Sequence, residues 1–255
     1  MTGSAGGPEP REKSLLQSRI ESVLHLMTGS IGNAVVMIGS LALATRALGP
    51  EAFGVMAMTL AVGRVCERIV RFESWQPLVR YAASEEAAAD PQRMARLYLF
   101  GLILDIVGAT VAAFLSIIVG FVLTRFFDFP PEMFSLVAIY AIAIALNLRG
   151  MSSAVMRMAG MFRTMAYIVF LAGFLRLFLA AIFYWAGSGL MTFVWVWTIS
   201  QVVDSLFYNF IAFRQLSRQG TPSPIRARVG NLLQDFPGFL GFAFTTNASS
   251  ALRTI

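Results

Sequence analysis

Several uninterrupted apolar segments, each long enough to cross a membrane, constrain this chain more than any other feature. A membrane-spanning helix needs about 18–20 consecutive apolar residues. The sequence has such runs at about 23–45, 53–72, 97–123, 133–150, 165–186 and 190–213. Transmembrane β-strands would instead be short and would alternate apolar with polar residues. Because the runs are continuous, the sequence predicts an all-α polytopic membrane protein with six transmembrane helices.

The composition agrees with a membrane protein and argues against a nucleic-acid-binding one. Hydrophobic residues make up 57% of the chain and charged residues only 13%, against about 25% charged in average globular proteins. The formal net charge is +6. The arginines are spread between the apolar runs and form no single basic face, so we expect no nucleic-acid partner.

The segments between and around the apolar runs divide the chain. Residues 1–22 form a polar tail, 23–213 a six-helix lobe and 214–238 a basic linker with Pro222 and Pro224. A further apolar run from 239 to 255 predicts the start of a seventh span. We also expect the second span to continue as helix toward Tyr81, and the fourth to continue in helical register through Arg149, Met158 and Arg163.

The distribution of basic residues predicts the orientation. Cytoplasmic loops of membrane proteins carry an excess of Lys and Arg. With a cytoplasmic N-terminus, the outer side has only Arg46 and Arg125. The cytoplasmic side then has Arg11, Lys13, Arg19, Arg80, Arg93, Arg96, Arg149, Arg157, Arg163, Arg214, Arg218, Arg226 and Arg228. Arg149, Arg157 and Arg163 are interpreted as determinants of this topology.

A charged stripe lies inside the second apolar run. At about 100° per residue, Arg64, Glu67, Arg68 and Arg71 fall on one side of a helix, together with Trp75. A charge near the bilayer centre costs about 2.5–3.5 kcal/mol on insertion scales, so the stripe should face protein or water. Arg64 lies roughly 16 Å from the outer end of its span, near the midplane. Three arginines against one glutamate predict a polar cavity for an anionic cargo.

Three more ionisable residues lie inside apolar runs: Asp105, Arg176 and Asp204. Arg176 is a candidate cargo contact or a structural partner in an ion pair. Asp105 and Asp204, with Glu67, are candidates for coupling transport to an ion gradient. The alternative is that they are counter-ions to the buried arginines, in which case the arginine stripe is a ladder of local ion pairs.

The sequence offers no pattern for a metal or cofactor. Cys66 is the one cysteine and His25 the one histidine. Neither has partners at the spacing of metal ligands, and a single cysteine cannot form a disulfide within the chain. We therefore expect no catalytic residues, metal or cofactor.

Three stretches together resemble one family. They are ALGPEAFG (47–54) between the first two spans, RMAGMFRTMA (157–166) between spans four and five, and NASSALRTI (247–255) after the basic linker. In their order and spacing they resemble the Wzx-type polysaccharide or oligosaccharide flippases of the multidrug/oligosaccharidyl-lipid/polysaccharide exporter superfamily. The resemblance covers about residues 14–255.

The resemblance implies a fold, a cargo and a location. Members have two six-helix lobes around a central cavity, so the chain would be the N-terminal lobe and the start of the second lobe of a longer, MATE-like protein. They move polyprenyl-diphosphate-linked oligosaccharides from the cytoplasmic to the periplasmic leaflet of the bacterial inner membrane for surface polysaccharide and lipopolysaccharide synthesis. By position, Arg64, Arg68 and Arg71 would meet the pyrophosphate. Expected partners are the lipid-linked oligosaccharide, membrane lipids and the polysaccharide polymerisation machinery.

Two other functions stay open. A drug or cation antiporter of the same fold would need an acidic cavity, whereas the first span has no Asp or Glu. A membrane-embedded glycosyl or phospho-sugar transferase would need a catalytic carboxylate pair or metal ligands in an interfacial loop. Glu85, Glu86 and Asp90 form the one loop cluster, and they fit a solvated helix face better, so we expect no enzyme.

Overall fold

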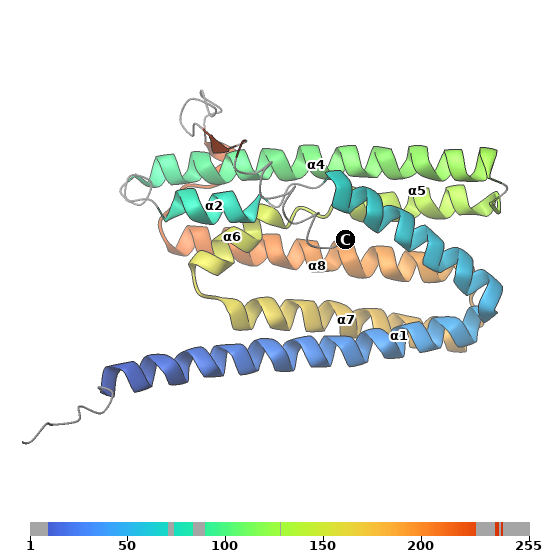
Figure 1. The fold of residues 1–255 in the computed structure, drawn as a ribbon, viewed down its shortest axis with the longest axis horizontal. Helices are drawn as coiled ribbons and strands as arrows, with labels where there is room; N and C mark the ends of the chain where they lie inside the picture. The colour runs from blue at the N-terminus through green and yellow to red at the C-terminus, as the bar shows by residue number, and fades with distance from the viewer. Residues whose placement is uncertain are drawn as a thin grey trace, which may run out of the picture.

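The computed structural model describes residues 10–70, 74–83, 90–127, 129–227, 238, 239 and 241, with side chains from residue 32 onward. Every regular element among them is a helix (Figure 1). The elements are α1 (Pro10–Val70), α2 (Trp75–Ala82), α4 (Pro91–Phe126), α5 (Glu132–Ala145), α6 (Gly150–Met158), α7 (Phe162–Trp185), α8 (Leu190–Arg218) and the short 3₁₀ helix η1 (Pro224–Arg226). The predicted all-α class is confirmed.

Four stretches of the described chain are long and apolar enough to cross a membrane: Pro91–Phe126, Glu132–Met158, Phe162–Trp185 and Leu190–Arg218. Their outer surfaces carry large apolar side chains, such as Phe114 and Ile118 on α4 and Phe178 on α7. The chain is therefore an all-α polytopic membrane protein. The total of six spans stays a prediction.

Helix α1 is bent at one residue. Gly49 has φ 74° and ψ 172°, a backbone conformation that glycine adopts without steric cost. Pro50 follows at the start of the second arm, where its missing N–H is tolerated. Figure 1 shows the first arm lying along α7 and the second arm crossing back toward α4 and α5. The two arms contain the predicted segments 23–45 and most of 53–72.

Two expectations of helical continuity are wrong. Helix α1 ends at Val70 and a separate helix, α2, begins at Trp75, so the second span does not run on as one helix toward Tyr81. Helix α5 ends at Ala145, and α6 begins only at Gly150. The apolar periodicity continues through this second break, but the polar residues Asn147 and Arg149 lie within it.

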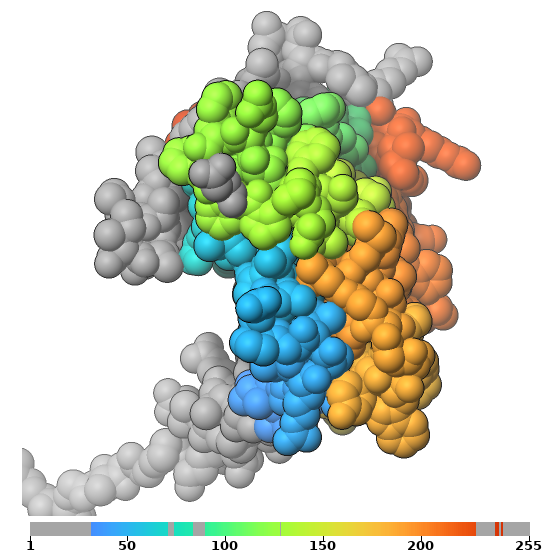
Figure 2. Space-filling view, turned by 90° about the vertical axis from the view of Figure 1, so that its right-hand side faces the viewer, coloured from blue at the N-terminus to red at the C-terminus, as the bar shows by residue number. Residues whose placement is uncertain are grey.

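The helices alternate in direction, so the chain turns at two ends of the bundle. The bend of α1, the α4–α5 turn and the α7–α8 turn lie at one end, and α2, α6 and η1 lie toward the other (Figure 1). Seen from the first end, α4 and α5 lie above the bend of α1, and α7 with α8 lies beside that bend (Figure 2).

Two apolar clusters hold this arrangement. One joins α1, α4, α5, α7 and α8 around Met56, Tyr140, Phe193 and Trp197. The other joins α2, α4, α6 and the end of α8 around Leu78, Leu97 and Met151. Phe239, the residue that follows the predicted linker, packs against Tyr81 and Phe100. The centre of its ring lies 5.4 Å from the centre of the Tyr81 ring and 4.8 Å from that of Phe100. Apart from Phe239, Gly238 and Gly241, the linker beyond Ala227 and the predicted seventh span lie outside the described residues.

Candidate functional site: a polar network around a broken helix

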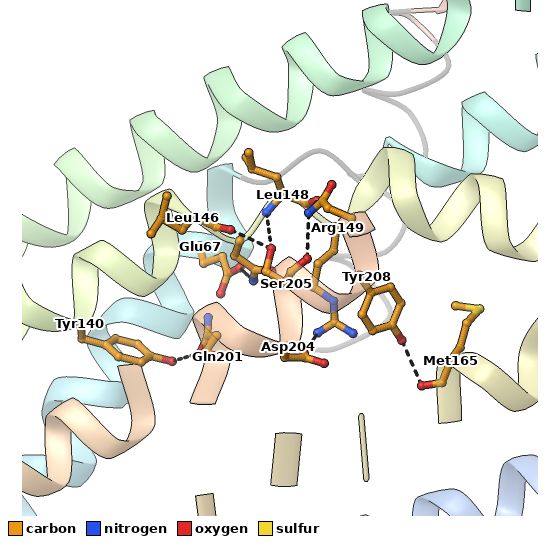
Figure 3. A network of polar contacts seen from close by, with 12 residues as sticks. Glu67, Tyr140, Leu146, Leu148, Arg149, Met165, Gln201, Asp204, Ser205 and Tyr208 are labelled. Carbon is orange, nitrogen blue, oxygen red and sulfur yellow. Dashed lines mark hydrogen bonds and ion pairs between the residues drawn. The ribbon is translucent and has the colours of Figure 1, made fainter. Parts of the chain in front are cut away.

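A non-helical stretch, 146–149, interrupts a membrane-spanning segment between α5 and α6. Side chains of α8 form hydrogen bonds with the backbone N–H and C=O groups of this stretch. Ser205 Oγ donates to the Leu146 carbonyl at 2.7 Å and accepts from the Leu148 N–H at 3.1 Å, as Figure 3 shows. Asn209 Nδ2 donates to the Leu148 carbonyl at 2.8 Å. Irregular backbone is tolerated at membrane depth only where protein or water satisfies it, and here side chains of α8 do so.

At the start of α6, a backbone N–H group donates a hydrogen bond to Asp105 of α4. Asp105 Oδ2 accepts the Met151 N–H at 2.7 Å, and Oδ1 accepts the Ser74 hydroxyl at 2.5 Å. A carboxylate is favourable at a helix N-terminus, where unbonded N–H groups carry partial positive charge. Asp105 was predicted as an ion-coupling group or a counter-ion to arginine. The structure adds a third role, the anchoring of α6 and of the residue that precedes α2.

Gly150 makes this anchoring possible. A Cβ at this position would collide with Ser74 Oγ and the Asp105 carboxylate. The absence of a side chain therefore lets the backbone of α6 approach the carboxylate closely enough for the hydrogen bond to form.

A partly buried ion pair lies at the last residue of the break. Arg149 Nη1 lies 2.6 Å from Asp204 Oδ2 on α8, and Asp204 is 8% exposed. The Arg149 guanidinium also lies 4.1 Å from the centre of the Tyr208 ring. Asp204 is thus the counter-ion of an arginine, as one alternative predicted, but its partner is Arg149. Arg149 was predicted to lie on a helical extension of the fourth span. Because the helix is interrupted at 146–149, the Arg149 side chain instead contacts α8.

The α1 stripe meets the break through Glu67. Its Oε1 accepts from Asn147 Nδ2 at 2.5 Å. Arg64 and Arg68, on the same stripe, are exposed. Arg71 lies outside the described residues. Trp75, predicted to share the stripe, belongs to the separate helix α2, where the Arg157 guanidinium lies 4.0 Å from its ring centre.

Arg176 completes the group from α7. Its guanidinium lies 5.5 Å from the centre of the Trp197 ring, and it is close enough to Tyr140, Arg64 and Asp204 for electrostatic interaction. The Tyr140 hydroxyl donates to Gln201 Oε1 at 2.8 Å and also lies within the electrostatic reach of Arg64. Arg64 and Glu67 of α1, Arg176 of α7 and Asp204 of α8 therefore lie near Tyr140 and the break.

Most of the uncharged polar side chains in this network were not predicted from the sequence. Gln201, Asp204, Ser205, Tyr208 and Asn209 recur three or four residues apart within one apolar run, so they form a polar stripe on one face of α8. That spacing could have identified them, but only the carboxylate was singled out. Among the described residues, no group of three His, Cys, Asp or Glu side chains could hold a metal ion.

The arrangement has a consequence for Arg64 and Arg68. Both are exposed on the surface of the chain, on the second arm of α1, which crosses back toward α4 and α5 (Figure 1). Placing two guanidinium groups against hydrocarbon is costly. If this arm spans the membrane, as the sequence predicts, the two side chains would have to face water or further protein.

Comparison with known proteins gives one relative. No protein-family model matches the chain, and no solved structure matches it. The chain is 24% identical over 233 residues to the inner membrane protein YghQ of Escherichia coli (strain K12). The match covers 91% of this chain and 66% of YghQ, so the chain spans just under two thirds of the length of its relative. The relative and the four apolar helical stretches together support a multi-pass inner membrane protein.

Proposed function

We propose that the chain takes part in moving a polyprenyl-diphosphate-linked oligosaccharide from the cytoplasmic to the periplasmic leaflet of the inner membrane, as a transporter and not as an enzyme. In this proposal it forms the six-helix N-terminal lobe of a MATE-like flippase, with its N-terminus in the cytoplasm. Its partners are the lipid-linked oligosaccharide, membrane lipids and the machinery that polymerises the polysaccharide. The likeness to an inner membrane protein supports the location.

One observation carries the proposal: Arg64 and Arg68 are exposed on the second arm of α1, beside a polar network that contains Arg176. A lipid diphosphate brings several negative charges to the membrane surface. Guanidinium groups bind phosphate oxygens through paired, charge-assisted hydrogen bonds. In a water-filled cavity bounded by a second lobe, these two arginines would face such a headgroup.

The uncharged polar groups of the network suit the glycan part of the proposed cargo better than a further charged group. Gln201, which is half-buried, accepts from the Tyr140 hydroxyl near Arg64 and Arg176, whereas Tyr140 and Asn147 are themselves buried. The Gln201 amide can exchange hydrogen bonds with sugar hydroxyls, while the polyprenyl tail stays in lipid outside the apolar surfaces of α4 and α7. Asp204 holds Arg149 and lies near Arg176, so it keeps a counter-charge inside the protein when no cargo is bound.

A flipping assay tests the proposal. The full-length chain carrying R64Q and R68Q is reconstituted into liposomes that contain a fluorescent polyprenyl-diphosphate oligosaccharide, and the rate of transfer between leaflets is measured. A charge-assisted hydrogen bond contributes about 1.5–3 kcal/mol, and 1.4 kcal/mol is tenfold. We therefore expect each substitution to slow transfer about tenfold or more.

The matched control is R46Q. Arg46 is also an exposed arginine of α1, but it lies near the bend at Gly49, away from the network. R46Q should flip the lipid at the unaltered rate. Unaltered transfer by the R64Q/R68Q protein, reconstituted in equal amount, would rule out the role of these arginines. If the protein that contains both lobes does not flip the lipid before substitution, the function itself is ruled out.

A further inference from the structure

Tyr140 of α5 is buried between α1 and α8. It is 1% exposed and belongs to the apolar cluster that joins α1, α4, α5, α7 and α8. Its ring lies directly against the α1 backbone at Gly63, where a Cβ would come 2.5 Å from the ring carbon Cδ1. An alanine at position 63 would collide with the ring, so the absence of a side chain allows this contact. The ring is therefore held beside Arg64, the next residue of α1.

The hydroxyl of Tyr140 joins α5 to α8 and leaves the lone pairs of its oxygen for other donors. It donates to Gln201 Oε1 at 2.8 Å (Figure 3), and this bond uses its one proton. The oxygen can still accept two hydrogen bonds. Arg64 lies within hydrogen-bonding and electrostatic reach of it, and Arg176 within electrostatic reach. The Tyr140 oxygen is thus an uncharged acceptor beside two guanidinium groups.

Arg176 comes from α7 and reaches the same place along α8. Its guanidinium lies 5.5 Å from the centre of the Trp197 ring. Trp197 and Gln201 are four residues apart on α8, so they lie on the same face of that helix, one turn from each other. The Arg176 guanidinium therefore lies about one turn from the amide that binds the Tyr140 hydroxyl.

The like charges of Arg64 and Arg176 lie within electrostatic reach of each other. Two such groups stay close together only where other groups hold them. A carboxylate in the place of the Tyr140 hydroxyl would hold a guanidinium and also neutralise it. A hydroxyl holds a guanidinium by a hydrogen bond and leaves the full charge for an external anion.

We propose that Tyr140 is a positioning residue of the cargo site: its hydroxyl holds the Arg64 guanidinium of α1 next to Arg176 of α7, in the orientation that meets the diphosphate. This inference rests on the proposed function. Tyr140 is buried and acts through Arg64, without touching the cargo. Gly63 has a supporting role, because it lets the tyrosine ring lie against α1.

Y140F tests the hydroxyl, because it keeps the buried ring against Gly63 and removes only the oxygen. Flipping of the fluorescent polyprenyl-diphosphate oligosaccharide is measured in liposomes over a range of lipid concentrations, with the protein that contains both lobes. We expect the half-saturating lipid concentration to rise about threefold to tenfold, as for the loss of one hydrogen bond, with the maximal rate unaltered. Y98F is the matched control, since Tyr98 is a buried tyrosine of α4 in the other apolar cluster, and it should alter neither quantity.

A double variant separates positioning from a purely structural role. If the hydroxyl acts through Arg64, Y140F should have no further effect on the half-saturating concentration in the R64Q background. A further rise in R64Q/Y140F equal to that in Y140F alone would overturn the proposal. Wild-type behaviour of Y140F in the flipping assay would overturn it as well, and would leave the proposed function standing.

A second measurement needs no cargo. Arginines of the purified protein are modified with phenylglyoxal, and the rate at Arg64 is followed by peptide mass spectrometry. The rate should be about threefold higher or more in Y140F, because the guanidinium loses a hydrogen bond. The exposed Arg46 should react equally in both proteins. Equal rates at Arg64 would overturn the positioning role, whether or not the protein flips lipid. A faster reaction at Arg64 in a protein that flips no lipid would support the positioning role and rule out the proposed function alone.

Discussion

The Arg149–Asp204 pair is the residue-scale feature that most affects stability. Burying one charge without the other is strongly unfavourable, because the low-dielectric interior does not replace its hydration. Asp204 is almost fully buried, and Arg149 is partly enclosed by Tyr208. Each charge therefore stabilises the fold only in the presence of its partner.

A double-mutant cycle tests this coupling. D204N and R149Q should each lower the stability of the purified protein, and the double variant should lose less than the sum of the two. Contacting charged residues in one network couple by about 0.5–3 kcal/mol. The measurement is the free energy of unfolding in mixed micelles, and strict additivity would mean that the pair contributes no interaction energy.

Ser205 is the second residue-scale case, since one hydroxyl serves two backbone groups of the break. S205A should destabilise the protein by about 1–3 kcal/mol, the cost of leaving a buried polar group unsatisfied. S200A is the matched control on the same helix, because the Ser200 hydroxyl bonds only the Val196 carbonyl of its own helix, at 2.6 Å. Hydrogen exchange of the amides at 146–149 should rise in S205A and stay unaltered in S200A. Equal behaviour of the two variants would contradict the role of Ser205.

At the scale of elements, the junction of α2, α4 and α6 depends on a position without a side chain. G150A places a Cβ against Ser74 Oγ and the Asp105 carboxylate, so it should displace α6 and lower the melting temperature. G54A is the control: Gly54 is also helical, has open space around it, and should tolerate alanine or gain from its higher helix propensity. A G150A protein as stable as G54A would show that the Asp105 contact does not hold α6.

The elements also show what could be predicted from the sequence. The long apolar runs located α4, α7 and α8 well, because a membrane span has to bury about 20 residues in hydrocarbon whatever its neighbours are. The break after Ala145 was missed, because it depends on Ser205 and Asn209, which lie more than 50 residues further along the chain. Charges inside apolar runs indicated Arg64, Arg176 and Asp204 as candidates, and the structure brings Arg64 and Asp204 near Arg176. Which partner each one meets is set by packing between helices, so Arg149 and Tyr140 could not be assigned from periodicity alone.

At the scale of the whole molecule, orientation is the first prediction. Ser188 lies in the α7–α8 turn, at the opposite end of the bundle from the start of α7. In intact cells, S188C in a C66A background should react with a membrane-impermeant thiol reagent added from outside, and R218C should react only after the cells are opened. The reverse pattern would place the N-terminus outside and would move the arginine-rich end to the periplasm.

The central claim is that Arg64 faces water on the route of an anionic lipid, and thiol accessibility tests it most directly. R64C is introduced in the full-length C66A chain, with I118C as the control because Ile118 is exposed on the apolar part of α4. A charged, water-soluble thiol reagent should label R64C and leave I118C unlabelled, and a polyprenyl-diphosphate oligosaccharide should slow the labelling of R64C. If R64C reacts only with a lipid-soluble reagent, as I118C should, the arginine faces the bilayer and the claim is contradicted.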